Sequence, residues 1–209
     1  MIAIIDYDAG NIKSVEKALI HLGEEVVVSR EPQILLSAEK VILPGVGSFG
    51  DAMNKLRGYG LEAIIQQIVE NKTPFLGICL GLQLLFESSE ESPGVKGLSL
   101  LPGKIVRIPD APGIKIPHIG WNSLTFPNKG KLFEGLSSES YVYFVHSYYL
   151  KADDESIVTG LTNYSTDIHA AVECENVFAC QFHPEKSSDV GLKILSNFIK
   201  IGREEKNAY

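Results

Sequence analysis

Hydrophobic residues in the first half of the chain follow two alternating spacings. Short unbroken apolar runs of buried-strand length predict strands at 1–7, 26–29, 40–43 and 75–78. Between these runs, apolar residues recur every three to four positions, which predicts amphipathic helices at 11–22, 61–70 and 80–86. Strands that alternate with helices favour an α/β protein whose mostly parallel sheet is covered on both faces.

The second half of the chain is richer in strand-like segments. Runs separated by Pro, Gly, Asn and Asp predict strands at 104–108, 141–149, 157–162, 170–174 and 177–181. A last amphipathic helix is predicted at 190–201, and we expect the polar tail after it to fray. The acidic run 87–91 is expected to be a solvated helix end and loop. With no repeat or linker, we predict one domain over 1–209.

The composition narrows the class of protein. A formal net charge of −7 without a dense basic face argues against nucleic-acid binding. Three cysteines without a Cys-x-x-Cys pattern fit a reducing compartment, and Cys174, Cys180 and His183 follow no standard zinc spacing. The apolar start is too short for a signal peptide, and no segment is long enough to span a membrane. We expect a cytoplasmic protein with neither metal nor cofactor.

Cys79 stands where the predicted strand 75–78 meets the predicted helix 80–86. Gly77 and Gly81 flank it in a Gly-x-Cys-x-Gly pattern, the thiol version of the nucleophile elbow, in which only glycine leaves room around a sharp strand-to-helix turn. The adjacent helix N-terminus favours thiolate over thiol. Because free cysteine is often buried, the pattern alone also allows Cys79 to be a small core residue.

A possible base for this nucleophile lies near the C-terminus, where a strand-like run ends in His183, Pro184 and Glu185. Side chains two residues apart in an extended segment point the same way, so we expect the imidazole and the carboxylate to lie side by side. Pro184 lacks an N–H and suits a strand end, where a substrate can reach the imidazole. Cys79, His183 and Glu185 therefore form a candidate triad of nucleophile, base and orienting acid.

A glycine-rich turn follows the predicted strand 40–43. In an open α/β sheet this turn lies near the elbow if the two strands are close, since ligands bind beyond the carboxyl ends of strands. Backbone N–H groups at Gly45 and Gly47, with the N–H of Leu80, are then candidates for an oxyanion hole. A plain turn without a catalytic role is the alternative.

Two more segments carry candidate binding residues. His146 and Ser147 stand at a predicted strand end and suit the charged head group of an amino acid, although such a histidine is often a core or rim residue. Trp121, the only tryptophan, lies in a predicted loop at 115–122. An exposed tryptophan there indicates a partner contact, and a core tryptophan fits the pattern equally well.

These motifs resemble those of the triad-type (class I) glutamine amidotransferases, whose fold is a flavodoxin-like α/β core with additional antiparallel strands. Within that family the chain is similar to the glutaminase subunits of imidazole glycerol phosphate synthases, which act in histidine biosynthesis. The resemblance extends over nearly the whole chain and is carried by the segments at 6–11, 44–50, 77–83, 116–122 and 183–187.

The resemblance implies hydrolysis of L-glutamine, with the ammonia passed through a tunnel to a (β/α)8 cyclase subunit in a heterodimer. It implies a Cys79, His183 and Glu185 triad and an oxyanion hole drawn from Gly45, Val46, Gly47 and Leu80. It also implies that glutamine is bound by Gln83, His146, Ser147 and Tyr148, and that the residues that contact the partner or act as a gate are Asn11, Trp121, Asn122 and Lys186.

Val46 adds a further expectation, because most relatives have a second glycine there. In this subfamily a peptide flip is thought to be needed before an N–H faces the pocket, and a β-branched residue resists unusual dihedral angles. The isolated chain is then nearly inactive until the cyclase binds its ligand. The alternatives are an amidotransferase subunit of a different synthase, a stand-alone γ-glutamyl hydrolase, and a non-catalytic binding module.

Overall fold

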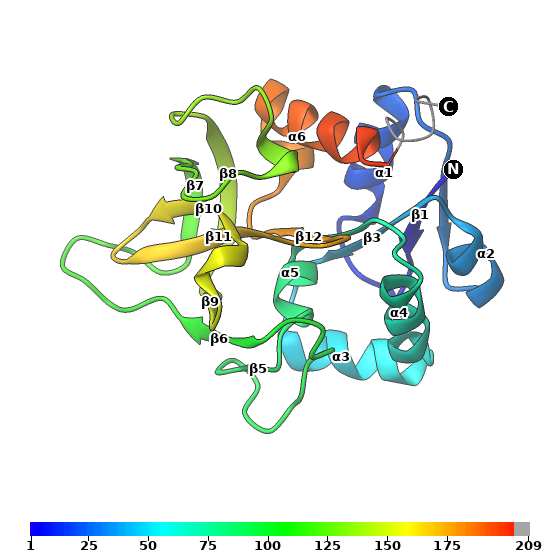
Figure 1. Cartoon of the computed structure of the whole chain (residues 1–209). Helices are drawn as coiled ribbons and strands as arrows, with labels where there is room; N and C mark the ends of the chain where they lie inside the picture. Colours follow the sequence, from blue (N-terminus) through cyan, green and yellow to red (C-terminus); the bar gives the residue numbers. More distant parts are fainter. Residues whose placement is uncertain (203–209) are drawn as a thin grey trace.

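The computed structural model describes residues 1–202 and contains a central sheet with helices on both faces (Figure 1). Its parallel half consists of β1 (Ile2–Ile5), β2 (Val26–Ser29), β3 (Lys40–Gly45), β4 (Phe75–Cys79) and β12 (Val177–Cys180). These strands lie in the order β2-β1-β3-β4-β12, and every neighbouring pair is parallel. Numbered along the chain, this is the 2-1-3-4-5 order of flavodoxin-like sheets, which confirms the predicted fold class.

Antiparallel strands extend the sheet beyond β12, as expected. The added strands are β11 (Asp167–Cys174), β9 (Tyr148–Ala152), β6 (Gly103–Arg107) and β5 (Ser88–Ser89), with β10 (Val158–Asn163) paired to β11. All these pairings are antiparallel except that of β5 with β6. Separately, β7 (His118–Ser123) and β8 (Tyr141–His146) form a two-stranded antiparallel ribbon.

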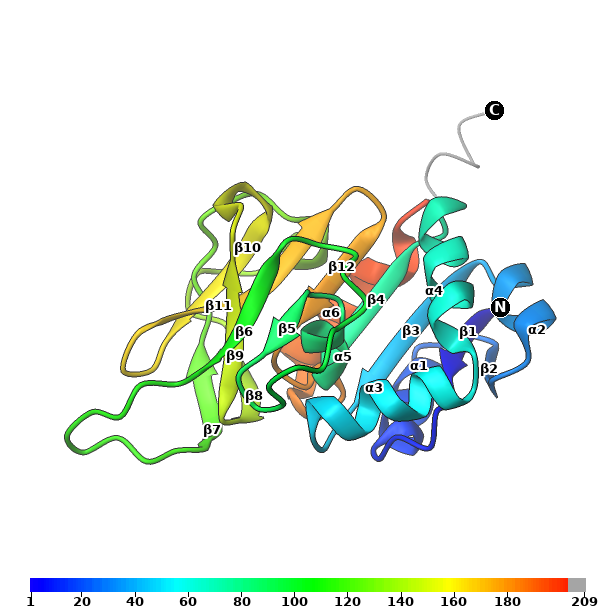
Figure 2. The same ribbon diagram turned by 90° about the horizontal axis from the view of Figure 1, so that it is seen from below.

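The helices divide between the two faces of the parallel half. One face carries α1 (Ile12–His21) and α6 (Ser188–Lys200). The other carries α2 (Pro32–Ser37), α3 (Phe49–Gly58), α4 (Leu61–Glu70) and α5 (Leu80–Leu84), as Figure 2 shows from below. Since strand side chains alternate between faces, Ile2 and Ile4 of β1 pack in the core beneath α1 and α6, whereas Ala3 and Ile5 pack in the other core.

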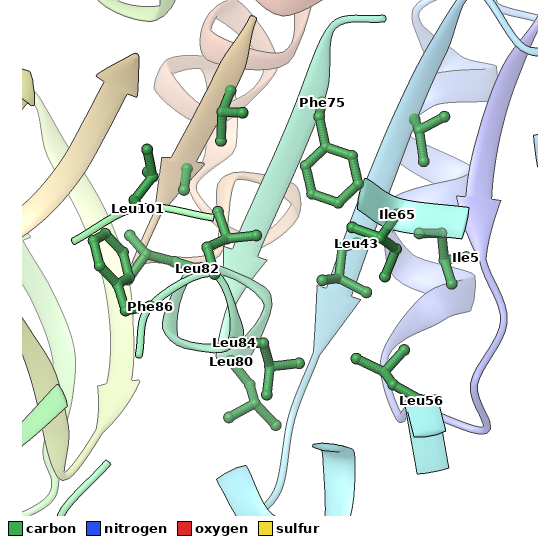
Figure 3. Packing of buried hydrophobic residues seen from close by; sticks show 14 of the residues in the cluster. Ile5, Leu43, Leu56, Ile65, Phe75, Leu80, Leu82, Leu84, Phe86 and Leu101 are labelled. Carbon is green, nitrogen blue, oxygen red and sulfur yellow. The ribbon is translucent and has the colours of Figure 1, made fainter. Parts of the chain in front are cut away.

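The hydrophobic core between α5 and the sheet fixes the position of that short helix. Leu80, Leu82 and Leu84 are all almost completely buried and pack in one cluster with Leu43 of β3 and Phe75 of β4 (Figure 3). A five-residue helix has little stability of its own, so this packing holds it in place. The first turn of α5, next to Cys79, is therefore a rigid part of the molecule.

Several element boundaries differ from those predicted. The strand at 40–43 continues to Gly45, because its pairing with β4 runs on until Gly45 is opposite Cys79. The single strand predicted at 141–149 is two strands, β8 and β9, separated at Ser147. The break arises because β8 pairs with β7 in the ribbon, whereas β9 belongs to the main sheet. The acidic run at 87–91 is not simply solvated, since it contains β5 and the buried Ser89.

Besides β5 and the short 3-10 turns, the prediction did not include α2, α3 and β7. The start of α3 carries a recognisable signal, because the Ser48 Oγ accepts a hydrogen bond from the Asp51 N–H at 3.3 Å, as an N-cap does. The expected fraying of the tail concerns residues that lie mostly outside the described range. Within residues 1–202, no helix is both long enough and apolar enough to cross a membrane.

Candidate active site

Cys79 adopts the backbone conformation of a nucleophile elbow. It joins β4 to α5 with φ 55° and ψ −110°, a region that costs a side-chain-bearing residue free energy. The flanking glycines are required by close packing: a Cβ at Gly77 would lie 2.8 Å from the Gly81 carbonyl oxygen, and a Cβ at Gly81 would overlap the Leu43 carbonyl oxygen. The Gly-x-Cys-x-Gly pattern is thus explained by the geometry of the turn.

His183 and Glu185 form a buried pair just after β12. The strand neighbours β4, and its last residue, Cys180, lies opposite Ile78, one residue before the elbow. His183 Nδ1 is 2.7 Å from Glu185 Oε1, and the two side chains are 1% and 0% exposed. The expected pairing is present, but the reason given for it was wrong, because 184–186 is a turn of 3-10 helix and not an extended segment.

Asn11 is a second hydrogen-bond partner of this carboxylate. Its Nδ2 donates to Glu185 Oε1 at 2.5 Å and lies 3.4 Å from His183 Nδ1. Asn11 has φ 70°, a left-handed conformation that asparagine tolerates better than most residues. The resemblance indicated Asn11 as a partner contact or gate residue, whereas in the structure its amide holds the orienting acid of the candidate triad.

The electrostatic surroundings of His183 favour its protonated form. Burial lowers its pKa, but the Cys79 sulfur and the Glu185 carboxylate outweigh that effect and raise the pKa from 6.5 to about 9. Within the described residues, Nε2 of His183 is buried and has no hydrogen-bond partner. A protonated imidazole whose Nε2–H is not committed elsewhere can act as a general acid.

Cys79 opens onto a cavity of about 340 Å³ beside the elbow. Of the predicted site residues, eight line this cavity: Val46, Gly47, Cys79, Leu80, Gln83, His146, Ser147 and Tyr148. Gly45 is not among the lining residues and lies opposite Cys79 in the β3–β4 pairing. The structure therefore brings the candidate nucleophile, oxyanion and substrate residues together beside the carboxyl ends of β3 and β4, where open α/β sheets bind ligands.

Gln181 was not predicted and links two of these groups. Gln83 Nε2 donates to Gln181 Oε1 and to the Tyr148 carbonyl oxygen, each at 3.0 Å. The Gln181 Nε2 in turn lies 3.7 Å from Cys79 Sγ. No short motif in the sequence marks Gln181, because β12 ends at Cys180 and the alternation of strand side chains does not extend to Gln181 and His183.

Two comparisons, with a protein-family model and with solved structures, show which proteins this chain resembles. The model of the family described as glutamine amidotransferase class-I matches residues 3–201. The chain belongs to this family. A crystal structure of a glutamine amidotransferase superposes with a TM-score of 0.73 at 22% identity, covering 95% of this chain and 99% of the other, which shows the shared fold.

Two curated relatives, which are the same enzyme subunit from two different organisms, are similar to this chain over almost their full length. The imidazole glycerol phosphate synthase subunit HisH of Moorella thermoacetica is 51% identical, covering 99% of this chain and 98% of the relative. The subunit of the same name from Methanothermobacter thermautotrophicus is 50% identical, covering 97% and 100%. The elbow of this class-I amidotransferase thus stands in a chain that matches those two relatives over nearly its whole length.

Glu91 is a pocket residue of this amidotransferase that the sequence analysis placed in a solvated loop, which was wrong. It lines the cavity, and its Oε2 accepts a hydrogen bond from the Phe49 N–H at 2.8 Å, at the start of α3. The carboxylate is therefore held at a helix N-terminus, where a negative charge is favoured. No spacing in the sequence distinguishes Glu91 from its acidic neighbours.

The residues expected at a partner surface lie on two exposed elements. Trp121 is 53% exposed and belongs to β7, so the core alternative is excluded, and residues 118–122 of the predicted loop are strand. Asn122 is half-buried in the same strand, and Lys186 is exposed in the turn after His183. Their contact with a partner stays a prediction.

Proposed function

We propose that this chain is the glutaminase subunit of an imidazole glycerol phosphate synthase and hydrolyses L-glutamine to glutamate and ammonia. The observation that carries the proposal is Cys79 at a strained elbow on the cavity, with the buried His183 and Glu185 pair at the end of the adjacent strand. The full-length similarity to two such subunits, at 51% and 50% identity, supports the choice of synthase.

The chemistry begins at the Cys79 sulfur. Its thiolate attacks the carboxamide carbon of glutamine, and the resulting oxyanion is held by the N–H of Leu80 and by an N–H of the 44–47 segment. His183 gives its proton to the departing ammonia, for which its raised pKa of about 9 suits it at neutral pH. The neutral imidazole then activates water against the γ-glutamyl thioester while Glu185 keeps it oriented.

The cavity suits an amino acid in size and charge. Its volume of about 340 Å³ is at the small end of ligand pockets. Gln83, His146, Ser147 and Tyr148 form its wall, and the Glu91 carboxylate offers a counter-charge to the ammonium group of glutamine. The substrate side chain then extends toward Cys79, since Cys79 and Leu80 line the same cavity.

Val46 makes the oxyanion hole conditional. It is 38% exposed and lines the cavity, and a Cβ placed on Gly10 would lie only 2.6 Å from its Cγ2. A β-branched side chain resists a backbone rotation that glycine would accept. Turnover by the isolated chain is therefore low, and binding of the liganded cyclase supplies the free energy for the rearrangement.

The partner is a (β/α)8 cyclase subunit that takes up the ammonia and forms imidazole glycerol phosphate and an aminoimidazole carboxamide ribotide. Asn11, Trp121, Asn122 and Lys186 contact it or gate the passage, on the side of the molecule that bears the triad. Ammonia then leaves the elbow directly into the partner without reaching bulk solvent.

Replacement of the nucleophile tests the proposal. Cys79→Ala should abolish glutamine-dependent synthesis by the complex and leave ammonia-dependent synthesis unchanged, since the cyclase site is intact. Cys174→Ala is the matched control, because Cys174 is a free, partly buried cysteine on β11, and it should retain both activities. Glutamine-dependent synthesis that persists in Cys79→Ala would refute the assignment.

A further inference from the structure

Two histidines near the cavity, His118 and His146, contact each other through their rings, and the proposed mechanism does not use this contact. His118 begins β7 and His146 ends β8, and they lie opposite each other in the ribbon. His118 is 3% exposed, with its ring stacked between those of Tyr164 at 3.9 Å and Phe144 at 4.8 Å. His118 Nδ1 is 3.3 Å from His146 Nε2, within reach of a hydrogen bond.

The hydrogen-bond partners decide which ring nitrogens carry protons. His146 Nδ1 lies 2.9 Å from the Tyr148 carbonyl oxygen, which can only accept, so this nitrogen carries a proton. In a neutral ring the Nε2 of His146 is then an acceptor, and His118 Nδ1 must be the donor to it. Both histidines are therefore Nδ1-protonated.

The contacts of Asn122, on the other side of His118, agree with these protonation states. Asn122 Nδ2 donates to the Asn163 carbonyl oxygen at 3.0 Å, and Asn122 Oδ1 accepts from the Ser123 N–H at 2.9 Å, so the amide orientation is fixed. The NH2 group of Asn122 then faces His118 Nε2 at 3.5 Å, the nitrogen left without a proton. Burial lowers the pKa of His118 to about 4 and that of His146 to about 3, so both rings are neutral at pH 7.

The Tyr148 carbonyl group, which accepts a hydrogen bond from His146 Nδ1, belongs to the cavity wall. The backbone leaves the ribbon at Ser147 and joins the main sheet at Tyr148, and both residues line the cavity. The Tyr148 oxygen also accepts from Gln83 Nε2 at 3.0 Å, so two donors fix it. Without a donor from His118, the buried Nε2 of His146 would lose its partner, and the ring would gain freedom to rotate away from Tyr148.

We propose that His118 is a positioning residue for the glutamine pocket, which braces the His146 ring so that the corner at 146–148 keeps its shape. The proposal rests on the glutaminase function only for the identity of the ligand. His118 lies on the inner face of the ribbon, shielded by Phe144 and Tyr164, and acts on the ligand through His146.

Nuclear magnetic resonance of the full chain with ¹⁵N-labelled histidine tests the arrangement without any substrate. The ring ¹⁵N shifts at pH 7 should show His118 and His146 both neutral and both protonated on Nδ1, with the signals assigned by His118→Phe and His146→Phe. A charged ring, or protonation of either residue on Nε2, would overturn the proposal even if the chain proves to be a glutaminase.

Steady-state kinetics of the complex with its cyclase test the consequence for binding. His118→Phe keeps a ring between Phe144 and Tyr164 but removes the donor, so KM for glutamine should rise about tenfold with little change in kcat. In a His146→Phe background the same substitution should have almost no effect on KM, because it acts through His146. Equal fold-changes in both backgrounds, or a fall in kcat alone, would contradict the proposal.

Tyr164→Leu is the matched structural control. It removes the ring stacked at 3.9 Å on His118 and leaves in place the groups that form the contact between His118 Nδ1 and His146 Nε2. We expect a lower melting temperature with KM within about twofold of the wild-type value. A KM increase as large as that of His118→Phe would show that packing, and not the hydrogen bond, is responsible.

Discussion

At the scale of single residues, the Glu185 carboxylate has no exposed surface, and its Oε1 receives hydrogen bonds from Asn11 and from His183. A buried charge needs such partners, and its field in turn keeps the imidazole oriented and protonated. The arrangement therefore makes His183 depend on Glu185 for its direction, and on Cys79 and Glu185 together for its charge.

Glu185→Gln should preserve the shape of the site and remove that charge. We expect kcat for glutamine hydrolysis to fall by about 10³-fold or more, as it does when the orienting acid of a catalytic triad becomes an amide. Glu173→Gln is a control at a second carboxylate, which accepts from the Lys131 and Leu132 N–H groups. Wild-type turnover in Glu185→Gln would exclude the orienting role.

The raised pKa of His183 also predicts a pH dependence of stability. Because the folded-state value of about 9 exceeds the ordinary 6.5, its stabilising effect is complete below pH 6.5 and is lost as the pH rises through 9. The free energy of unfolding from urea titrations should fall over this window by up to about 3 kcal/mol. The fall should be smaller in Glu185→Gln, and an equal fall in both proteins would count against the pair.

His118 and His146 predict the opposite trend in acid. Their lowered pKa values mean that the unfolded chain takes up protons below pH 6.5 while the folded rings stay neutral, so stability is lost from pH 6.5 toward about 4. Between pH 6.5 and 5, His118→Phe should lose less unfolding free energy than the wild-type chain. A steeper loss in the variant would exclude a neutral buried His118.

Local patterns explain which residues the sequence could predict. Cys79 stands in a five-residue motif whose glycines are dictated by the turn itself, and His183 and Glu185 are neighbours in the chain. Gln181 and Glu91 reach the site only through strand pairing and through a contact with α3, respectively. Their roles depend on tertiary structure, so no short motif indicated them.

At the scale of elements, the elbow depends on how closely α5 approaches β3. Gly81 has no room for a side chain, since a Cβ would overlap the Leu43 carbonyl oxygen. That oxygen is backbone in the middle of the sheet and cannot move aside as a side chain can. The short helix and the nucleophile turn are consequently set by the sheet.

Gly81→Ala should therefore destabilise the chain by about 3 kcal/mol or more and abolish glutamine turnover. Gly58→Ala is the matched control, because a Cβ at Gly58, the last residue of α3, would meet nothing within 4 Å. This variant should be neutral or stabilising by up to about 1 kcal/mol. Thermal unfolding measures both, and equal melting temperatures for the two variants would contradict the packing argument.

The elements that the sequence predicted best were those with a clear apolar run or a strong helical periodicity. The strand at 26–29 and the helix at 61–70 have the predicted bounds. By contrast, residues 118–122 of β7 were placed in a loop, because the segment 115–122 holds Pro117 and Asn122, residues disfavoured in strands. Its pairing with β8 supplies the stability that its composition does not predict.

At the scale of the whole molecule, the carboxyl ends of β3, β4 and β12 gather the site at one edge of the sheet, and β8 of the ribbon ends at the same cavity. The outer face of the ribbon exposes three large apolar side chains, Ile119 at 60%, Trp121 at 53% and Tyr141 at 55%. Strand alternation and the β7–β8 register place all three on one face. This face is suited to the cyclase contact proposed above.

Trp121→Ala should weaken association with the cyclase by about tenfold or more, since a large exposed aromatic side chain is a common hot spot. The melting temperature of the isolated chain should change little, because half of the side chain is already exposed. Ile20→Ala removes an equally exposed apolar side chain from the last turns of α1 and should leave association unchanged. Calorimetric titration with the cyclase would show whether the two variants differ as expected.

Glutamate release from L-glutamine, measured for the purified chain alone and with a cyclase subunit carrying its nucleotide ligand, tests the central claim most directly. We predict almost no release by the chain alone and rapid release with the liganded partner, abolished in both cases by Cys79→Ala. Release that is equally rapid without the partner would keep the triad and remove the gate at Val46. Release that survives Cys79→Ala, or none from a folded complex, would contradict the account.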